Sequence, residues 1–343
     1  MNITRIASGI FIAMAVIALL ILGKDFILPL ILAILIWFLI KEIRKVLSKL
    51  PVVGSKTPEW VLSVLATIML FVMSGLMIGM IVDNIESLSQ NIDVYQSNFD
   101  LINLRFQKEY DINFSELFST YLGDYDFSSI FTMLLNSISE LFSRTFIIGF
   151  YVLFLFFEEN VFRRKLQYLY PETAKFNDVS MTLDRISTAI SKYISLKTLV
   201  SLITGVSSFI ALLAIGVDTP IFWAFLIFIL SFIPVVGALI AVLFPATIAL
   251  FQFGDLTHFF MVLGIIGFIQ LIVGNVLEPK IMGNSLNVSS LVVILSLSFW
   301  GMLWGITGMV LSVPITVIMI IFFAQFPNTK SLAIMLSEKG DVN

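Results

Sequence analysis

Two stretches in the C-terminal half of the chain share one pattern, FLIFILSFIPVVGALIAVLFPATIAL at 225–250 and LVVILSLSFWGMLWGITGMVLSVPITVIMI at 291–320. Each begins as an apolar run, is interrupted by Pro or Gly, and resumes as a second apolar run that contains Pro-x-Thr. Pro and Gly are the residues that interrupt helices most strongly. We therefore predict one helical hairpin at 220–253 and another at 288–323. The expected breaks and hinges are Pro234, Gly237 and Pro245 in the first hairpin and Gly305, Gly308 and Pro314 in the second.

A single apolar span at 257–274 separates the two hairpins. Each hairpin arm has about 12–17 residues, whereas a helix needs about 20 to cross a bilayer, so re-entrant or broken helices are expected. One crossing between two hairpins inverts the second relative to the first. Inverted pairs of broken helices form the substrate path of many secondary transporters. The alternative is two ordinary hairpins in which Gly and Pro serve only packing.

The composition is that of a membrane protein. Of the 343 residues, 59% are hydrophobic and 13% are charged, whereas soluble domains have about 25% charged residues. We expect an all-α, polytopic transmembrane protein with about eight spans and an extramembrane helical hairpin arm. There is no Cys and one His, which excludes disulfides and thiolate metal sites. No nucleotide-binding loop or protease motif is present, so we expect no enzyme, no cofactor and no bound metal.

Charge in the loops predicts how the chain is organised. Residues 41–56 hold five Lys or Arg and one acid, and residues 158–192 hold six Lys or Arg and five acids. Residues 83–140 hold ten acids and two bases. Loops rich in Lys and Arg stay in the cytoplasm, so both termini are expected inside and the acidic segment outside. The expected segments are three spans in 1–82, an acidic helical arm at 83–140, a fourth span at 141–157, a basic cytoplasmic loop at 158–193, a transmembrane core at 194–326 and a cytoplasmic tail at 327–343.

Three local patterns refine this organisation. Gly23-Lys24-Asp25 is predicted to be the turn of a hairpin formed by the first two spans, which favours an anchored N-terminus over a cleaved signal peptide. A heptad seam from Ile78 to Phe106 predicts one long helix that continues from the third span to about Glu109, with a return helix from near Asp126. This arm packs against neighbouring subunits or forms a self-contained hairpin. Residues 172–192 are predicted to form an amphipathic helix on the inner membrane surface, which is either a passive interfacial helix or a lever coupled to transport.

The most polar segment of the C-terminal half, NVLEPKIMGNSLNVSS at 275–290, contains the candidate transport path or ion site. On a continuing helix, Asn275 and Glu278 share a face, and Pro279 is expected to end that helix. Lys280 is the nearest counter-charge, and a turn follows. A carboxylate and an amide facing a cavity at membrane depth bind a cation or carry a proton. The alternative is a solvated helix end.

Further candidates lie on either side of this segment. The expected turn is Gly283-Asn284, and Asn284 is included in the candidate path. Gln270 lies deep in the preceding span, where it lines the path or bonds a neighbouring helix. At the other end of that span, Asp255 and His258 form either a helix cap or a pH-sensing pair.

The segment NVLEPKIMGNSLNVSSLVVILSLSFWGMLWGITGMVLSVPITV resembles the marked region of the autoinducer-2 exporter (AI-2E) family of bacterial inner-membrane permeases, which runs Asn-x-x-Glu-Pro, a basic residue, two apolar residues and Gly. FIPVVGALIAVLFPATIAL resembles a second marked region. One departure is Ala238, where many members are expected to have Pro. By position, the family's marked residues are Pro234, Gly237, Pro245, Asn275, Glu278, Pro279, Gly283, Gly308 and Pro314.

The resemblance implies a multi-pass permease of the bacterial inner membrane that assembles as a homo-oligomer, with a ring of five as the expected form. It implies export of a small polar solute, with the quorum-sensing signal autoinducer-2 as the candidate, or exchange of Na⁺ for H⁺. A third hypothesis is a membrane scaffold that transports nothing. The expected partners are the lipid bilayer, a small-molecule solute and Na⁺ or H⁺, and no nucleic acid.

Overall fold

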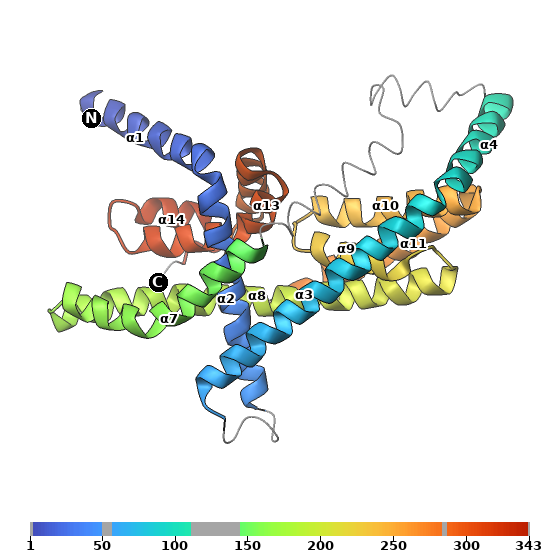
Figure 1. Ribbon diagram of the computed structural model, residues 1–343. Coiled ribbons are helices and arrows are strands. Elements are labelled where there is room, and N and C mark those ends of the chain that lie inside the picture. The colour runs from blue at the N-terminus through green and yellow to red at the C-terminus, as the bar shows by residue number, and fades with distance from the viewer. Residues whose placement is uncertain (1–2, 50–56, 111–144, 283–286, 342–343) are drawn as a thin grey trace. The chain divides into compact units, whose positions relative to one another are not determined.

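The computed structural model describes residues 3–49, 57–110, 145–282 and 287–341, and every regular element in these ranges is a helix. This confirms the all-α prediction (Figure 1). The elements are α1 (Ile3–Leu22), α2 (Lys24–Ser48), α3 (Glu59–Gln90), α4 (Ile92–Tyr110), α7 (Thr145–Leu169), α8 (Thr173–Ile215), α9 (Pro220–Leu230), α10 (Val236–Phe253), α11 (Leu256–Ile272), the π-helix η1 (Val273–Leu277), α12 (Glu278–Met282), α13 (Ser290–Ala324) and α14 (Lys330–Leu336).

Within the described ranges, six helical segments are long and apolar enough to cross a membrane, and two shorter apolar helices accompany them. The chain is therefore a polytopic membrane protein. The fourth expected span, 141–157, lies partly outside the described residues, and α7 is not among the six. The six segments are Lys24–Ser48, Trp60–Met77, Thr173–Ile215, Val236–Phe253, Leu256–Met282 and Ser290–Ala324.

The chain divides into two compact units that interleave in the sequence. Unit 1 contains Met1–Thr67, Arg144–Leu196 and Asn284–Asn343, and unit 2 contains Ile68–Ser143 and Lys197–Gly283. The hairpin formed by α9 and α10 therefore belongs to unit 2, whereas the hairpin formed by α13 belongs to unit 1. The helices α3 and α8 pass from one unit to the other.

In unit 1, α1 and α2 form a bent rod (Figure 1), so the prediction of a hairpin at Gly23-Lys24-Asp25 was wrong. Helical hydrogen bonds continue on both sides of the bend, from Gly23 N to the Leu19 carbonyl (2.8 Å) and from Ile27 N to the Gly23 carbonyl (2.9 Å). A Cβ on Gly23 would lie 2.7 Å from the Leu19 oxygen, so the bend requires Gly. The cytoplasmic position of the N-terminus stays a prediction.

The second hairpin packs on this bent rod. Trp304 donates its indole N–H to the Leu20 carbonyl next to the bend (3.0 Å). Trp300, Trp304 and Leu311 form a buried cluster with Leu28 of α2. Between the arms, the Ser296 hydroxyl lies 2.6 Å from the Thr316 hydroxyl and donates to the Ser312 carbonyl (3.0 Å). These polar contacts fix the two arms in register inside an apolar environment.

Both hairpins turn at strained or glycine-specific backbone. In the first, Val235 has φ 60° and ψ −62°, and Val236 N donates to the Pro234 carbonyl at 2.6 Å, which is a strained γ-turn. In the second, the chain reverses at Gly305, which has φ 62° and ψ −144°. Pro245 and Pro314 lie inside the following helices, so neither marks a turn, and their role as hinges stays a prediction.

A close backbone approach recurs in the two hairpins. A Cβ on Gly237 would lie 1.8 Å from the Leu230 carbonyl oxygen, and one on Gly308 would lie 1.9 Å from the Trp300 oxygen. In both Pro-x-Thr sequences, the Thr hydroxyl donates to the carbonyl four residues earlier (2.8 and 2.7 Å). The repeat inferred from the sequence therefore corresponds to repeated local geometry.

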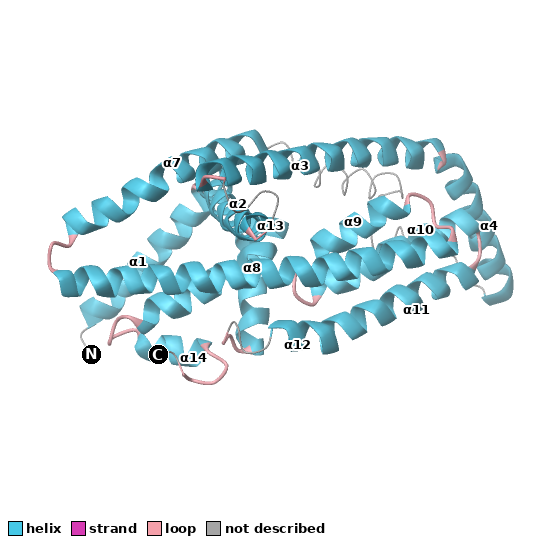
Figure 2. Ribbon diagram, turned by 90° about the horizontal axis from the view of Figure 1, so that it is seen from below, coloured by secondary structure: helices cyan, strands magenta, loops and turns pink. Residues whose placement is uncertain are grey.

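In unit 2, α9, α10 and α11 lie side by side, and α4 lies against the end of α10 (Figures 1 and 2). The predicted long arm is present as two helices, because Asn91 interrupts α3 and α4. The predicted return helix near Asp126 lies outside the described residues. The predicted interfacial helix at 172–192 is the first half of α8, an unbroken helix of 43 residues.

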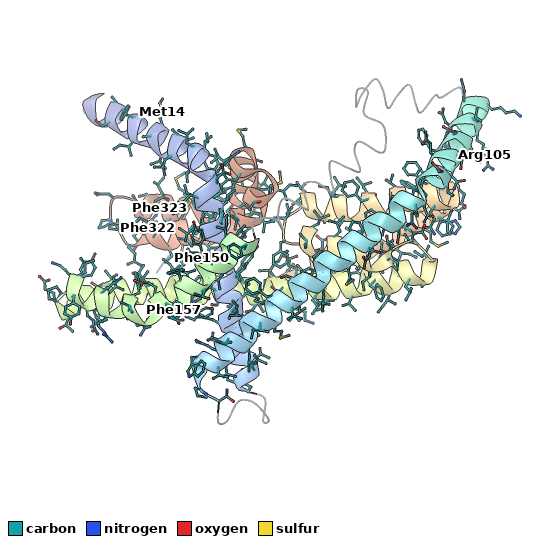
Figure 3. The ribbon with its side chains drawn as sticks, in the orientation of Figure 1. Met14, Arg105, Phe150, Phe157, Phe322 and Phe323 are labelled. Atoms are coloured by element: carbon teal, nitrogen blue, oxygen red, sulfur yellow. The ribbon has the colours of Figure 1, made fainter. Side chains whose placement is uncertain are left out.

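Large apolar side chains cover the outer surfaces of the helices (Figure 3). Met14, Phe150 and Phe157 are 63%, 53% and 69% exposed. A soluble protein rarely leaves so many large apolar side chains exposed. These surfaces are therefore suited to contact lipid.

Candidate functional site

An ion pair joins α8 to the start of α12, the helical turn that continues α11 and η1 in unit 2. Lys197 is the only charged residue between positions 193 and 217, and its side chain is 6% exposed. Its ammonium group donates a hydrogen bond to the Glu278 carboxylate, which is 28% exposed. A buried ammonium group without a counter-charge is strongly destabilising. The Lys197–Glu278 pair therefore holds the two helices together as long as both charges are present.

A local widening of the helix positions Glu278. The π-helix η1 follows α11 directly, and α12 begins at Glu278. We expected Pro279 to end the helix, but helical structure continues through Pro279 to Met282. Proline lacks an N–H and its ring clashes with the carbonyl four residues earlier. A preceding π-turn shifts that carbonyl, and such turns are frequent at functional sites.

The other candidate residues of this segment do not join Glu278. Asn275 is exposed and its side-chain amide donates to the Leu271 carbonyl (3.1 Å). Lys280 is also exposed, so Lys197 is the counter-charge of Glu278 and the expectation for Lys280 was wrong. Gln270 is half-buried on α11, and its Nε2 has no hydrogen-bond partner among the described residues. Gly283 and Asn284 lie outside the described residues.

The sequence reading missed Lys197, although a signal for it was present. It stands alone in the apolar run 194–215, and an ionisable residue inside a membrane span is a functional candidate by default. What the sequence could not show is its partner, because Lys197 and Glu278 are 81 positions apart.

A polar cluster joins the arm helix α4 to the opposite end of unit 2. Tyr95 donates its hydroxyl to Asp218 (2.8 Å), and Asn98 donates to the Phe251 carbonyl (2.7 Å). Gln252 accepts from the Asp218 N–H (2.7 Å) and donates to the Gly216 carbonyl (2.9 Å). We call this cluster the arm contact. Burial, and then the hydrogen bond and charge of Asp218, raise the pKa of Tyr95, so it stays a neutral donor.

The arm contact bears on the role of the arm. Tyr95 and Ile102, two members of the heptad seam, are buried, and Phe99 packs edge-on against Phe251 with ring centroids 5.7 Å apart. The described part of the seam therefore packs against α10 and its loop within the same chain. Neither alternative drawn from the sequence included this arrangement, because a seam does not identify its partner.

Asp255 and His258, next to the arm contact, form a helix cap. Asp255 accepts from the His258 backbone N–H (2.8 Å), and the His258 ring stacks on Phe253 with centroids 3.9 Å apart. Desolvation pushes the pKa of Asp255 upward, but hydrogen bonds from His258 and Thr257 outweigh it, so the pKa is lowered. The His258 Nδ1 also lies 2.8 Å from the Asp255 carboxylate. The structure therefore contains both the cap and the ring–carboxylate pair, and pH sensing by this pair stays a prediction.

The arm contact and the Lys197–Glu278 pair are separated by the thickness of a bilayer. From Lys197 to Gly216 the chain is helical to Ile215, which corresponds to about 28 Å at about 1.5 Å per residue. The hydrocarbon core of a bilayer is about 30 Å thick. The two polar clusters are therefore spaced to lie at opposite faces of the membrane. Lys197 of α8 is bound to Glu278 at one of them, and the segment after α8 is bound to α10 at the other.

A cavity of about 500 Å³ lies between α3, α8 and α9, lined by Met77, Leu202, Phe225 and neighbouring apolar side chains. Almost all of its lining area is apolar. A polar solute would lose its hydrogen bonds to water there without replacement. We therefore do not assign the solute path to this cavity.

The arm contact can be tested by replacing Tyr95 with Phe. A hydrogen bond to a charged group contributes about 1.5–3 kcal/mol, so the amides of α4 should exchange with deuterium about ten times faster, because 1.4 kcal/mol is a factor of ten. Gln96→Ala changes an exposed neighbour on α4 and serves as the control. Unchanged exchange in Tyr95→Phe would show that the arm is held by its apolar contacts alone.

Comparison with known proteins decides the family. The family described as AI-2E family transporter matches residues 10–328, which is nearly the whole chain. The chain belongs to the AI-2E transporter family. A Haemophilus influenzae protein described as "Putative transport protein" is 30% identical over 99% of this chain and 98% of its own length. The AI-2 transport protein TqsA of Escherichia coli K12 is 36% identical over 61% of this chain and 60% of its own length.

Membership in the AI-2E family confirms the resemblance drawn from 275–317 and 232–250. The chain is a transporter-family protein with several membrane-spanning helices. In this chain, Glu278 of the marked Glu-Pro binds the buried Lys197 of α8.

Proposed function

We propose that this protein is an inner-membrane permease that exports a small polar solute, with autoinducer-2 as the candidate. The Lys197–Glu278 pair carries the proposal. It joins an almost fully buried ammonium group on α8 to a partly exposed carboxylate that follows α11, and a buried charge without its partner is strongly destabilising. Separating the pair would open the path at that end.

Autoinducer-2 is chosen as the candidate solute because of a similar protein. TqsA is described as an AI-2 transport protein, and its similarity covers part of this chain. We further propose that the protein lies in the bacterial inner membrane, that both termini are cytoplasmic, and that it assembles as a homo-oligomer. The basic segments 41–56 and 158–192 support that orientation.

The test is efflux from proteoliposomes. Vesicles containing the purified full-length protein and loaded with autoinducer-2 should release it faster than protein-free vesicles, as measured in the external medium with a reporter strain. Glycerol and an uncharged pentose, loaded in parallel, show whether release is selective. Release at the protein-free rate would reject autoinducer-2 as the solute.

The same vesicles separate the other two hypotheses. A sodium-dependent change of internal pH, lost in Glu278→Gln, would support cation/proton exchange instead. Absence of flux for solute, Na⁺ and H⁺ would support a scaffold. If the protein is a scaffold that acts through its arm, deletion of residues 85–135 should reproduce whatever cellular phenotype follows loss of the whole protein.

A further inference from the structure

One face of α8 carries a line of buried hydroxyl groups. Ser201, Thr204 and Ser208 are 0%, 1% and 0% exposed. Their spacing, counted from Lys197, is four, three and four residues, which places all of them on one face of the helix. The line therefore begins at the Lys197–Glu278 pair and runs toward the arm contact.

Two of these hydroxyl groups have unmet hydrogen-bonding capacity. Thr204 donates to the Val200 carbonyl (2.9 Å), which is the usual solution for a hydroxyl inside a helix. Ser201 and Ser208 have no hydrogen-bond partner among the described residues. A buried polar group without a partner destabilises the folded state, so an unpaired hydroxyl at these positions needs a reason other than stability.

The α11 side chain Gln270 also has an unpaired polar atom, at about the same distance from the Lys197–Glu278 pair as the α8 hydroxyl groups. Gln270 precedes Glu278 by eight residues, about 12 Å along α11, and Ser201 to Ser208 lie about 6–16 Å from Lys197 along α8. Both helices extend from the Lys197–Glu278 pair toward the arm contact: α8 ends at Ile215, and α11 begins at Leu256, shortly after Gln252, whose side chain bonds Gly216. The unpaired Gln270 Nε2 is therefore within the depth covered by the serines.

We propose that Ser201, Thr204, Ser208 and Gln270 form a polar track that hydrates and binds an uncharged, hydroxyl-bearing solute during transport. Between the Lys197–Glu278 pair and Asp218, α8 contributes hydroxyls and no ionisable group. A bare cation prefers carboxylate and carbonyl oxygens, whereas hydroxyl and amide groups match a neutral solute that donates and accepts hydrogen bonds. This inference rests on the proposed transport function and identifies the chemical class of its solute.

Cysteine labelling tests the track, because the chain has no cysteine of its own. In membrane vesicles with the full-length protein, Ser201→Cys and Ser208→Cys should be modified by the water-soluble reagent aminoethyl methanethiosulfonate, since a thiol reacts as the thiolate in water. Leu212→Cys is the matched control, because Leu212 is 0% exposed on the same face one turn further on. Leu199→Cys, 47% exposed on the apolar surface, controls for reaction from lipid.

Modification of both serine positions at least ten times faster than of Leu212→Cys supports the track. Equal rates at all positions would overturn it and make the serines packing residues. Autoinducer-2 at saturating concentration should slow the modification. If the serine positions are modified quickly and autoinducer-2 does not slow the reaction, the hydrated track is supported and autoinducer-2 is rejected as the solute. The proposed track and the proposed solute can therefore be rejected independently.

A variant without the two hydroxyls gives an independent result. Ser201→Ala combined with Ser208→Ala removes unpaired buried groups, so the melting temperature should stay the same or rise. Solute efflux should fall about tenfold, which corresponds to the loss of about one hydrogen bond to the solute. A lower melting temperature with unchanged efflux would show that the hydroxyls stabilise the fold and do not contact the solute.

Discussion

Glu278→Gln should destabilise the protein strongly, because it leaves Lys197 buried without a counter-charge. Breaking a buried ion pair from one side costs about 3–5 kcal/mol. Glu278 is 28% exposed, so water reaches the pair and the lower end of that range is expected. The measurement is thermal unfolding in detergent, followed by the fluorescence of the five Trp residues.

The double variant Lys197→Met, Glu278→Gln isolates the interaction. It removes both charges, so most of the lost stability should return, and the coupling energy from the double-mutant cycle should be at least about 2 kcal/mol. Lys280→Met changes an exposed cation two residues away and should shift stability by no more than about 0.5 kcal/mol. If the double variant is as unstable as the sum of the single variants, the two side chains act independently. Because the path has lost its closing contact, vesicles with the double variant should release solute faster than wild-type vesicles.

Gly308→Ala and Gly237→Ala should prevent their hairpins from closing. The new methyl group would lie 1.9 or 1.8 Å from a carbonyl oxygen, and a backbone atom cannot move away by a change of rotamer. Overpacking of a fitted interior costs about 1–3 kcal/mol and sometimes more, and these backbone clashes should reach or exceed about 3 kcal/mol. Thermal unfolding measures the loss.

Gly264→Ala and Gly75→Ala are the matched controls for this prediction. Both positions are in helices and have nothing within 4 Å of an added Cβ. Ala is favoured over Gly in a helix by about 0.8–1.0 kcal/mol, so these variants should be as stable as the wild type or more so. Comparable losses at all four glycines would mean that the effect is general and that the hairpin turns are not the cause.

Several features followed from local sequence alone. Hydrophobic runs predicted an all-α membrane protein, and the Pro and Gly interruptions predicted two hairpins. The heptad seam predicted the arm as far as about Glu109, and α4 ends at Tyr110. These predictions succeed because helix length, apolar character and turn residues depend on neighbours within a few positions.

Predictions about how elements continue were less successful. Gly23 bends the chain where a hairpin turn was expected, and Pro279 lies within helical structure where a stop was expected. Each of these two residues can either continue a helix or end it. The hydrogen bond from Trp304 to Leu20 accompanies the bent but continuous helix at Gly23. The π-helix before Glu278 allows helical structure to continue through Pro279.

The sequence by itself determined that this chain is a helical membrane protein of a transporter family, because apolar periodicity and the Asn-x-x-Glu-Pro segment are local properties. Only the tertiary structure decided that Glu278 pairs with Lys197 and that Tyr95 binds Asp218. These contacts join residues up to 123 positions apart. The physical reason is that a buried charge or hydroxyl needs a partner, and the fold as a whole determines which distant residue supplies it.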